Sequence, residues 1–207
     1  MTPLPDLAGA SLAVVTIDVH RGHLDPAVAT MPLAADRATR VVAANGRLVA
    51  AARDHGLPVV HVVTSYHGVE EISSNPWWAS VAGSDATRGG VLRHQLPGSP
   101  GLEVMPQVLD AARDIVVSSK KRYDCFHATE LDHVLRSRGV DTLLLTGVNT
   151  NSCVLATTIA ANTRDYRAIV VAECVDTMDP THHDTALAII GQAFGWVASL
   201  DDVVSAL

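Results

Sequence analysis

The sequence predicts an α/β protein with a doubly wound, Rossmann-like open sheet of about six mostly parallel strands and helices on both faces. Short runs of branched apolar residues recur without polar alternation, as expected for strands covered on both faces. Segments with apolar residues at helical spacing stand between these runs, and parallel neighbours need such crossover connections. We expect a single domain spanning residues 1–207, because 48% of the residues are hydrophobic and only 18% are charged.

Each expected strand is an apolar run bounded by polar or turn-forming residues. The first run, Leu-Ala-Val-Val-Thr-Ile, ends at Asp18, and the third delivers Lys120 at its carboxyl end. In chain order the expected strands are residues 12–17, 57–64, 114–119, 141–145, 167–173 and 196–199.

The expected helices combine apolar periodicity with recognisable ends. The longest ends before Gly56, another is capped by Thr129 and ended by Gly139, and the last has Pro180 in its first turn. In chain order the expected helices are residues 33–55, 106–113, 130–138, 151–164 and 180–194.

The apolar residues of segment 65–100 show neither helix nor strand periodicity, which predicts a long loop. Loops of this length are uncommon in compact domains. The adjacent Trp77 and Trp78 favour an ordered loop, which we expect either near the active site or at a subunit interface. An apolar loop of this kind is hard to place on a monomer surface, so we also expect a homo-oligomer, a dimer or a tetramer.

The composition excludes several classes of partner. The net charge of −7 argues against nucleic acid and against an anionic membrane, so we expect a small-molecule substrate. No apolar run approaches the roughly 20 residues that span a bilayer, and residues 1–6 lack the features of a signal peptide. Three cysteines without metal-binding spacing, Cys125, Cys153 and Cys174, indicate reduced thiols and a cytoplasmic location.

Three chemically useful side chains are predicted at one edge of the sheet, where the carboxyl ends of parallel strands bind ligands. Asp18 follows the first strand, Lys120 ends the third, and Cys153 begins the helix after the fourth. Only Lys120 and Lys121 among the 15 basic residues are lysines, and a lysine, unlike arginine, can lose its proton when buried. Near a helix N-terminus, Cys153 is either a nucleophile held as thiolate or a small buried hydrophobe.

An aspartate, a lysine and a cysteine together can hydrolyse an amide through a thioester. Asp18 would accept the thiol proton and pass it to the departing amine, while Lys120, as ammonium, would keep the aspartate charged and favour the thiolate. Backbone N–H groups of Asn149 and Cys153 are expected to bind the oxyanion, because a turn that feeds a helix directs amides outward.

The segments that carry these residues resemble the isochorismatase-like cysteine hydrolases. Residues 14–18 match the family's apolar strand ending in Asp, and residues 120–131 match its Lys-x-x-Tyr-x-x-Phe stretch. Residues 146–154, Thr-Gly-Val-Asn-Thr-Asn-Ser-Cys-Val, match its most specific motif. The resemblance runs from about residue 11 to about residue 200.

By this resemblance, Asp18, Lys120 and Cys153 form the catalytic triad, and the bond between Val148 and Asn149 is a cis peptide. Lys121 does not fit the motif's spacing, and we expect it at the surface or at an interface. Members of the family generally assemble into oligomers, which agrees with the expectation drawn from the tryptophans.

The thiol separates this chain from the isochorismatases proper, which lack it and cleave a vinyl ether. Zinc-bearing nicotinamidases carry Asp-x-His and further histidines after the second strand, whereas residues 66–72 here read Tyr-His-Gly-Val-Glu-Glu-Ile. We therefore expect no metal and no cofactor. The prediction is an amidohydrolase, acting on C–N bonds other than peptide bonds and related to N-carbamoylsarcosine amidase, biuret hydrolase and nicotinamidase.

The expected substrate is a small linear amide, carbamoyl or ureide compound. Three alternatives stay open at this point: a nicotinamidase-like amidase, an isochorismatase-like ether hydrolase, and a non-catalytic binding protein of the same fold.

The segment after Asp18 departs from the family's Asp-x-Gln-x-x-Phe pattern, because His20 and His23 replace the glutamine and the aromatic residue. An imidazole at position 23, with Arg21, favours a polar or anionic substrate. The two histidines are equally consistent with a second role, in which they order the loop through backbone hydrogen bonds. Metal binding is a third alternative, although the sequence identifies no further ligand for it. The expected substrate contacts are His23, Arg21, Trp77, Trp78, Arg93, His94, Gln95, Tyr123 and Asn149.

Overall fold

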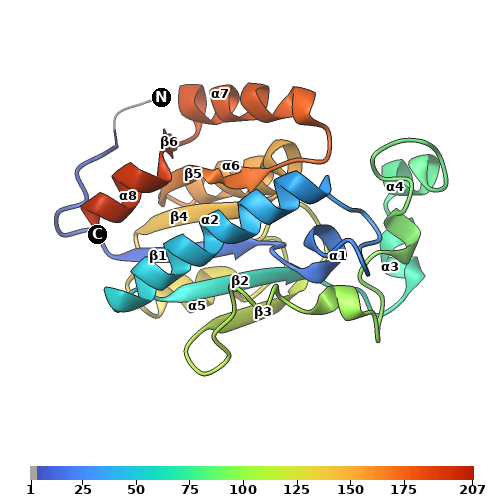
Figure 1. Ribbon diagram of the computed structural model, residues 1–207, viewed down its shortest axis with the longest axis horizontal. Helices are drawn as coiled ribbons and strands as arrows, with labels where there is room; N and C mark the ends of the chain where they lie inside the picture. The colour runs from blue at the N-terminus through green and yellow to red at the C-terminus, as the bar shows by residue number, and fades with distance from the viewer. Residues whose placement is uncertain (1–3) are drawn as a thin grey trace.

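A computed structural model describes residues 4–207, so the first three residues of the expected domain lie outside the described residues. Its centre is a sheet of six strands in the order β3-β2-β1-β4-β5-β6, with every neighbouring pair parallel (Figure 1). The fold-class prediction is therefore confirmed. The strands are β1 (Leu12–Ile17), β2 (Val59–Thr64), β3 (Ile115–Lys120), β4 (Thr142–Val148), β5 (Arg167–Asp176) and β6 (Trp196–Ala198).

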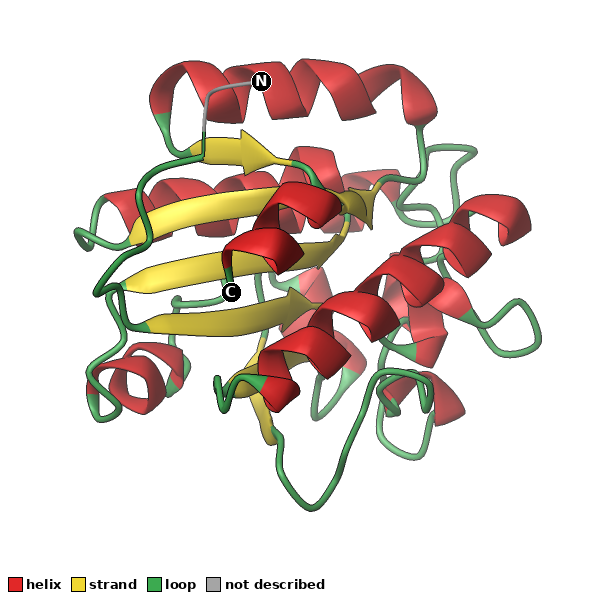
Figure 2. Ribbon diagram, turned by 60° about the vertical axis from the view of Figure 1, so that its left-hand side comes forward, coloured by secondary structure: helices red, strands yellow, loops and turns green. Residues whose placement is uncertain are grey.

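Helices cover both faces of the sheet (Figure 2). Helices α2 and α8 pack on one face, whereas α5, α6 and α7 supply buried residues on the other. The α-helices are α1 (Arg21–Leu24), α2 (Ala35–Asp54), α3 (Val69–Ser73), α4 (Pro76–Val81), α5 (Leu131–Arg136), α6 (Leu155–Asn162), α7 (His183–Ala193) and α8 (Leu200–Ala206).

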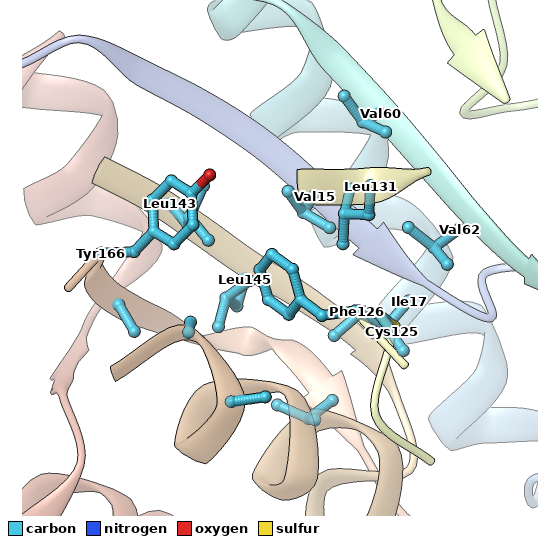
Figure 3. Packing of buried hydrophobic residues seen from close by; sticks show 14 of the residues in the cluster. Val15, Ile17, Val60, Val62, Cys125, Phe126, Leu131, Leu143, Leu145 and Tyr166 are labelled. Atoms are coloured by element: carbon cyan, nitrogen blue, oxygen red, sulfur yellow. The ribbon is translucent and has the colours of Figure 1, made fainter. Parts of the chain in front are cut away.

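The alternation of side chains along β1 builds two core layers. Val15 and Ile17 belong to the cluster with α5 and α6, whereas Val14 belongs to the cluster with α2. Figure 3 shows the first cluster, in which Val15 and Ile17 share a core with Leu131 and Phe126. Burial of each such side chain stabilises the fold by roughly 1.5–3 kcal/mol. Because β1 is packed on both faces in this way, the position of its carboxyl end is fixed.

The expected helix at residues 106–113 is wrong. Side-chain hydrogen bonds form turns there instead: the N–H of Asp110 donates to the Asp114 carboxylate, and the N–H of Ala112 donates to the Asp110 carboxylate. Aspartate side chains compete with helical backbone bonds in this way. The short helices α1 and α8 were not predicted from the sequence.

Residues 65–100 contain α3, α4 and two 3₁₀ turns, Val91–Arg93 and Pro100–Leu102. Helix α4 begins with Pro76 after an Asn75 cap, whose side chain accepts a hydrogen bond from the N–H of Trp78. A small cluster of buried side chains orders the segment: Met31, Tyr66, Ile72, Trp78 and Val91. Figure 1 shows α1, α3 and α4 beyond the carboxyl ends of the strands, the edge where the predicted catalytic residues lie.

No helix among residues 4–207 is both long enough and apolar enough to cross a bilayer.

Candidate active site

Asp18 and Lys120 form a buried ion pair at the carboxyl edge of the sheet. Lys120 Nζ lies 2.5 Å from Asp18 Oδ2 and 2.6 Å from Thr64 Oγ1. The Thr64 N–H and hydroxyl both donate to Asp18 Oδ1 at 2.8 Å. Both charged side chains are almost fully buried, so this hydrogen bonding offsets the cost of taking the charges out of water.

The backbone around Asp18 brings β1 and β4 unusually close together. Asp18 has a φ of 52°, a left-handed conformation that few residues other than glycine, asparagine and aspartate adopt readily. Gly147 lies opposite Ile17 in β4 with a φ of 105°, and a Cβ there would fall 1.9 Å from the Ile17 carbonyl oxygen. Gly147 is therefore required by close backbone approach as well as by φ.

Cys153 lies in a π-helical turn, Thr150–Val154, that joins β4 to α6. The helix expected from residue 151 therefore starts as α6 only at Leu155, and neither Thr150 nor Asn151 caps it. The Cys153 side chain is buried, and Lys120 Nζ lies 3.4 Å from its Sγ. The Val148–Asn149 peptide bond before the turn is cis.

Burial and charge set the protonation states of the three groups. Burial raises the pKa of Asp18, but the Lys120 ammonium and His20 outweigh it and hold this pKa well below its usual range. Burial lowers the pKa of Lys120, but the negative charge of Asp18, together with the two nearby cysteines and the hydrogen bond to Asp18, outweighs burial and raises this pKa. Burial also raises the pKa of the Cys153 thiol more than Lys120 lowers it. These directions favour a carboxylate on Asp18, an ammonium on Lys120 and a thiol on Cys153.

A pocket opens onto these groups from the solvent side. Its outer wall comes largely from residues 65–100, which supply Tyr66, Trp78, Arg88, Val91 and His94. The remaining lining residues are Asp18, His23, Thr64, Lys120, Arg122, Tyr123 and Cys153. A thiol, a carboxylate and an ammonium group thus face one small space.

A family model described as the isochorismatase domain matches residues 12–202. The chain belongs to this family. The match spans all six strands and every residue that lines the pocket.

Named relatives of this isochorismatase-domain protein are amidohydrolases. Maleamate amidohydrolase from Pseudomonas putida is 29% identical over 199 residues, which are 96% of this chain and 88% of the relative. Ureidoacrylate amidohydrolase from Methylobacterium radiotolerans is 36% identical over 174 residues, which are 81% of this chain and 67% of the relative. The solved structure of a cysteine hydrolase from Pseudomonas syringae has a TM-score of 0.80 at 23% identity, covering 100% of this chain and 95% of its own, and it shows the shared fold.

Among the residues expected to contact substrate, His23, Trp78, His94 and Tyr123 line the pocket of this isochorismatase-domain protein. Trp78 and Tyr123 are joined, since the indole N–H donates to Tyr123 Oη at 2.6 Å. The two aromatic side chains therefore form one fixed wall.

Four other residues expected to contact substrate do not line this pocket. Arg21 pairs with Asp25 at 2.8 Å on a different part of the surface, because acidic side chains are within its reach there. Gln95 is fully buried and donates to the Gly101 carbonyl, so it orders the loop. Trp77 is 66% exposed because it lies on the solvent side of α4, and Arg93 is also absent from the pocket wall.

The Asn149 side chain holds the turn before Cys153 and does not line this pocket. Its Oδ1 accepts the N–H of Met178 at 2.9 Å, which links the turn to the end of β5. Thr150 is tied in the same way, with its Oγ1 3.0 Å from His183 Nδ1. The side chain of Asn149 thus positions the Cys153 turn.

Sequence reasoning missed Thr64 and Arg88. Thr64 ends an apolar strand, the same signal that identified Asp18, but threonine is common in strands and carries no chemical signature of its own. Arg88 lies in the segment without period, 4.5 Å above the Tyr123 ring, and its Nη2 donates to Ser152 Oγ at 3.0 Å. No local pattern places a loop arginine next to a residue 64 positions later.

A second hollow lies at the amino ends of the strands, lined by residues such as Leu12, Val59 and Asp114. Its lining includes neither a cysteine nor a lysine, and its Asp114 is already paired with Arg53 and His61. The reactive groups are at the opposite edge, so we assign the candidate active site there.

Proposed function

We propose that this protein is a cysteine-dependent amidohydrolase that cleaves a small linear amide, carbamoyl or ureide through a thioester on Cys153. The observation that carries the proposal is the placement of Lys120 Nζ, 2.5 Å from the Asp18 carboxylate and 3.4 Å from Cys153 Sγ. The amidohydrolase names of the two relatives support hydrolysis of a C–N bond other than a peptide bond.

In the first half-reaction, Asp18 takes the proton of the Cys153 thiol and the sulfur attacks the substrate carbonyl carbon. Burial raises the pKa of Cys153, so the sulfur starts as a thiol. A base is therefore needed to remove its proton before the sulfur can attack. The backbone N–H groups of Asn149 and Cys153 are the proposed donors to the oxyanion. Asp18 then returns its proton to the leaving nitrogen, and the C–N bond breaks to leave the thioester.

In the second half-reaction, Asp18 accepts a proton from water, and the hydroxyl attacks the thioester carbonyl. The C–S bond breaks, the acid product leaves, and the sulfur regains the proton. Lys120 stays an ammonium throughout, because the negative charge of Asp18 raises its pKa despite burial. Its role is to hold Asp18 as a carboxylate and to stabilise negative charge on the sulfur as it develops.

The wall of the pocket favours a substrate that carries a carboxylate. Arg88 and Arg122 are among the residues that line the pocket, and guanidinium binds carboxylate through paired hydrogen bonds. Arg88 is preorganised by the Tyr123 ring and by Ser152. We therefore place anionic amides such as maleamate and ureidoacrylate above neutral amides such as nicotinamide.

Product release from a panel of substrates tests the proposal, measured as ammonia for the nitrogen compounds and as pyruvate for isochorismate. The panel contains maleamate, ureidoacrylate, an N-carbamoyl amino acid, biuret, nicotinamide and the vinyl ether isochorismate. We expect turnover of at least one anionic linear amide by the wild-type protein and none by Cys153→Ala. Hydrolysis of isochorismate alone would support the ether hydrolase, and no turnover on the panel would favour the binding protein.

The proposed steps require neither a metal nor a cofactor. We also propose a cytoplasmic location, because Cys125, Cys153 and Cys174 are all free thiols.

A further inference from the structure

Three buried histidines meet beside the catalytic pocket. His20 and His23 flank the first turn of α1, and His94 ends the 3₁₀ turn Val91–Arg93. One nitrogen from each ring lies within 4.8 Å of the other two, and all three side chains are at least 95% buried. His20 and His23 are close together in the sequence, whereas only the fold brings His94 next to them.

The hydrogen bonds of His23 and His94 engage the Nδ1 atom of each ring. His23 Nδ1 lies 2.7 Å from the Met31 carbonyl oxygen and must donate to it, which leaves its Nε2 with a lone pair. His94 Nδ1 lies 2.8 Å from Thr30 Oγ1, a hydroxyl that accepts a proton from this nitrogen or donates one to it, depending on the tautomer. A histidine that binds a metal commonly donates its other ring N–H to a carbonyl or hydroxyl in this way.

His20 is the unusual member of the cluster. It is fully buried, and neither of its ring nitrogens has a hydrogen-bond partner within residues 4–207, although its Nε2 is 3.5 Å from Asp18 Oδ1. A buried polar group without a hydrogen-bond partner destabilises the fold by about 1–3 kcal/mol. A ligand bound to the His20 nitrogens would remove this cost.

We propose that His20, His23 and His94 bind one first-row divalent transition-metal ion, such as Zn²⁺, through three imidazole nitrogens. Zinc bonds to imidazole nitrogen at about 2.0–2.1 Å, which places ligand nitrogens about 3.3 Å apart in a tetrahedral site. The nitrogens lie within 4.8 Å of one another, and the His20 and His23 rings are stacked with centroids 4.9 Å apart, so the rings must reorient to bind one ion. Three neutral nitrogen ligands suit zinc, copper, nickel and iron better than magnesium or calcium.

All three rings of the cluster are buried, and charges of both signs lie nearby. Neutral imidazoles bind metals but attract anions weakly. Lys120 and Arg88 oppose a cation here, whereas the Asp18 carboxylate next to His20 attracts it.

The bound ion would face the catalytic pocket. His23 and His94 both line this pocket, so the coordination positions that the histidines do not fill are open to a small ligand entering it. Two of its ligands, His20 and His23, lie on the segment after β1, and His94 follows β2 but lies outside residues 66–72, where the sequence shows no metal-binding pattern. The inference does not depend on the proposed thioester chemistry.

Titration of chelator-treated wild-type protein with Co²⁺ tests the inference without any assay of activity. We expect one Co²⁺ per chain, visible d–d absorption typical of low coordination number, and displacement by one equivalent of Zn²⁺. His94→Gln should weaken binding by ~100-fold or more, since even loss of a partner that orients a ligand costs 10–100-fold. His67→Gln, at an exposed histidine of the same segment, should bind as wild type.

Two further measurements keep the outcome decisive. Circular dichroism checks that His94→Gln is folded, and X-ray absorption of the zinc-loaded wild-type protein counts imidazole ligands without any variant. Cys153→Ser should retain the metal. Absence of stoichiometric binding to the wild-type protein, binding that Cys153→Ser abolishes, or fewer than three imidazoles at the zinc would overturn the inference.

Discussion

Lys120 Nζ is 2.5 Å from Asp18 Oδ2, and the two residues come from strands that are not neighbours in the sheet. Strand β2 lies between them and contributes Thr64, which hydrogen-bonds to both. The ion pair thus spans three strands at their carboxyl ends. Its geometry leads to the first prediction.

Lys120→Met should abolish most activity while Lys121→Met should not. Without the ammonium, the buried Asp18 has no counter-ion, its pKa rises, and it no longer exists as a base at neutral pH. Loss of general acid–base function typically lowers the rate by 10²–10⁴-fold, so kcat/KM should fall by about that factor. Lys121 is a matched control, because its ammonium bonds to the Ser65 carbonyl instead. Equal losses in both variants would contradict a specific role for Lys120.

Activity should show no ionisation near the pKa of histidine. The Lys120 ammonium holds the pKa of Asp18 well below its usual range, so its carboxylate is lost only under strongly acidic conditions. The pKa of Lys120 is raised, so its charge persists in base. Measurement of kcat/KM from pH 5 to pH 9 on metal-free protein should therefore find no acid limb near pH 6.5. Such a limb would indicate a histidine base.

Stability should fall as the pH drops below about 6.5. His23 has a folded-state pKa of about 3 against about 6.5 when unfolded, so the unfolded chain binds the proton first. Neutral His23 makes its full contribution to the free energy of unfolding above its unfolded-state pKa. This contribution is lost at about 1.4 kcal/mol per pH unit as the pH falls toward the folded-state pKa. Urea unfolding at pH 7, 6 and 5 measures this slope. His23→Gln should make it shallower, and an unchanged slope would argue that other groups cause it.

Gly147→Ala should destabilise the fold by about 3 kcal/mol or more, because the new Cβ would overlap the Ile17 backbone. Gly139→Ala is the matched control: it has a φ of +68° but open space around the Cβ position, so it should cost only about 1–2 kcal/mol. Chemical denaturation of both variants separates steric overlap from conformational cost. A similar loss in both would show that the close approach of β1 and β4 is not limiting.

Cys153 should react with iodoacetamide before Cys125 or Cys174. All three thiols have raised pKa values through burial, but Cys153 lines the candidate active-site pocket, and Lys120 stabilises its thiolate as the proton leaves. Peptide mapping after brief labelling identifies the site. Earlier labelling of Cys125 or Cys174 would mean that the pocket does not give access to Cys153.

Self-association should depend on Trp77. Its side chain is 66% exposed on α4, an unusual position for a large apolar group, and an interface between copies of the chain would cover it. Light scattering after size-exclusion chromatography should give a dimer or tetramer for the wild-type protein and a smaller species for Trp77→Ser. A monomeric wild-type protein would contradict this expectation.

The parts of the site that lie at strand ends could be predicted from the sequence. Asp18 and Lys120 each follow an apolar run, and topology alone brings the carboxyl ends of parallel strands to one edge. The π turn before α6 could not be predicted, since apolar spacing does not distinguish it from the first turn of an α-helix. Arg88 could not be predicted as a neighbour of the candidate catalytic residues, because tertiary packing and not local periodicity positions residues 65–100.

The thioester on Cys153 is the central claim, and its capture tests the account most directly. A substrate from the ammonia panel is mixed with the protein, quenched in acid during turnover, and digested for mass spectrometry. We predict an acyl group on the Cys153 peptide that appears with ammonia and disappears as substrate is exhausted. Full turnover by Cys153→Ala, or ammonia release by the wild-type protein with acylation of another residue, would contradict the mechanism.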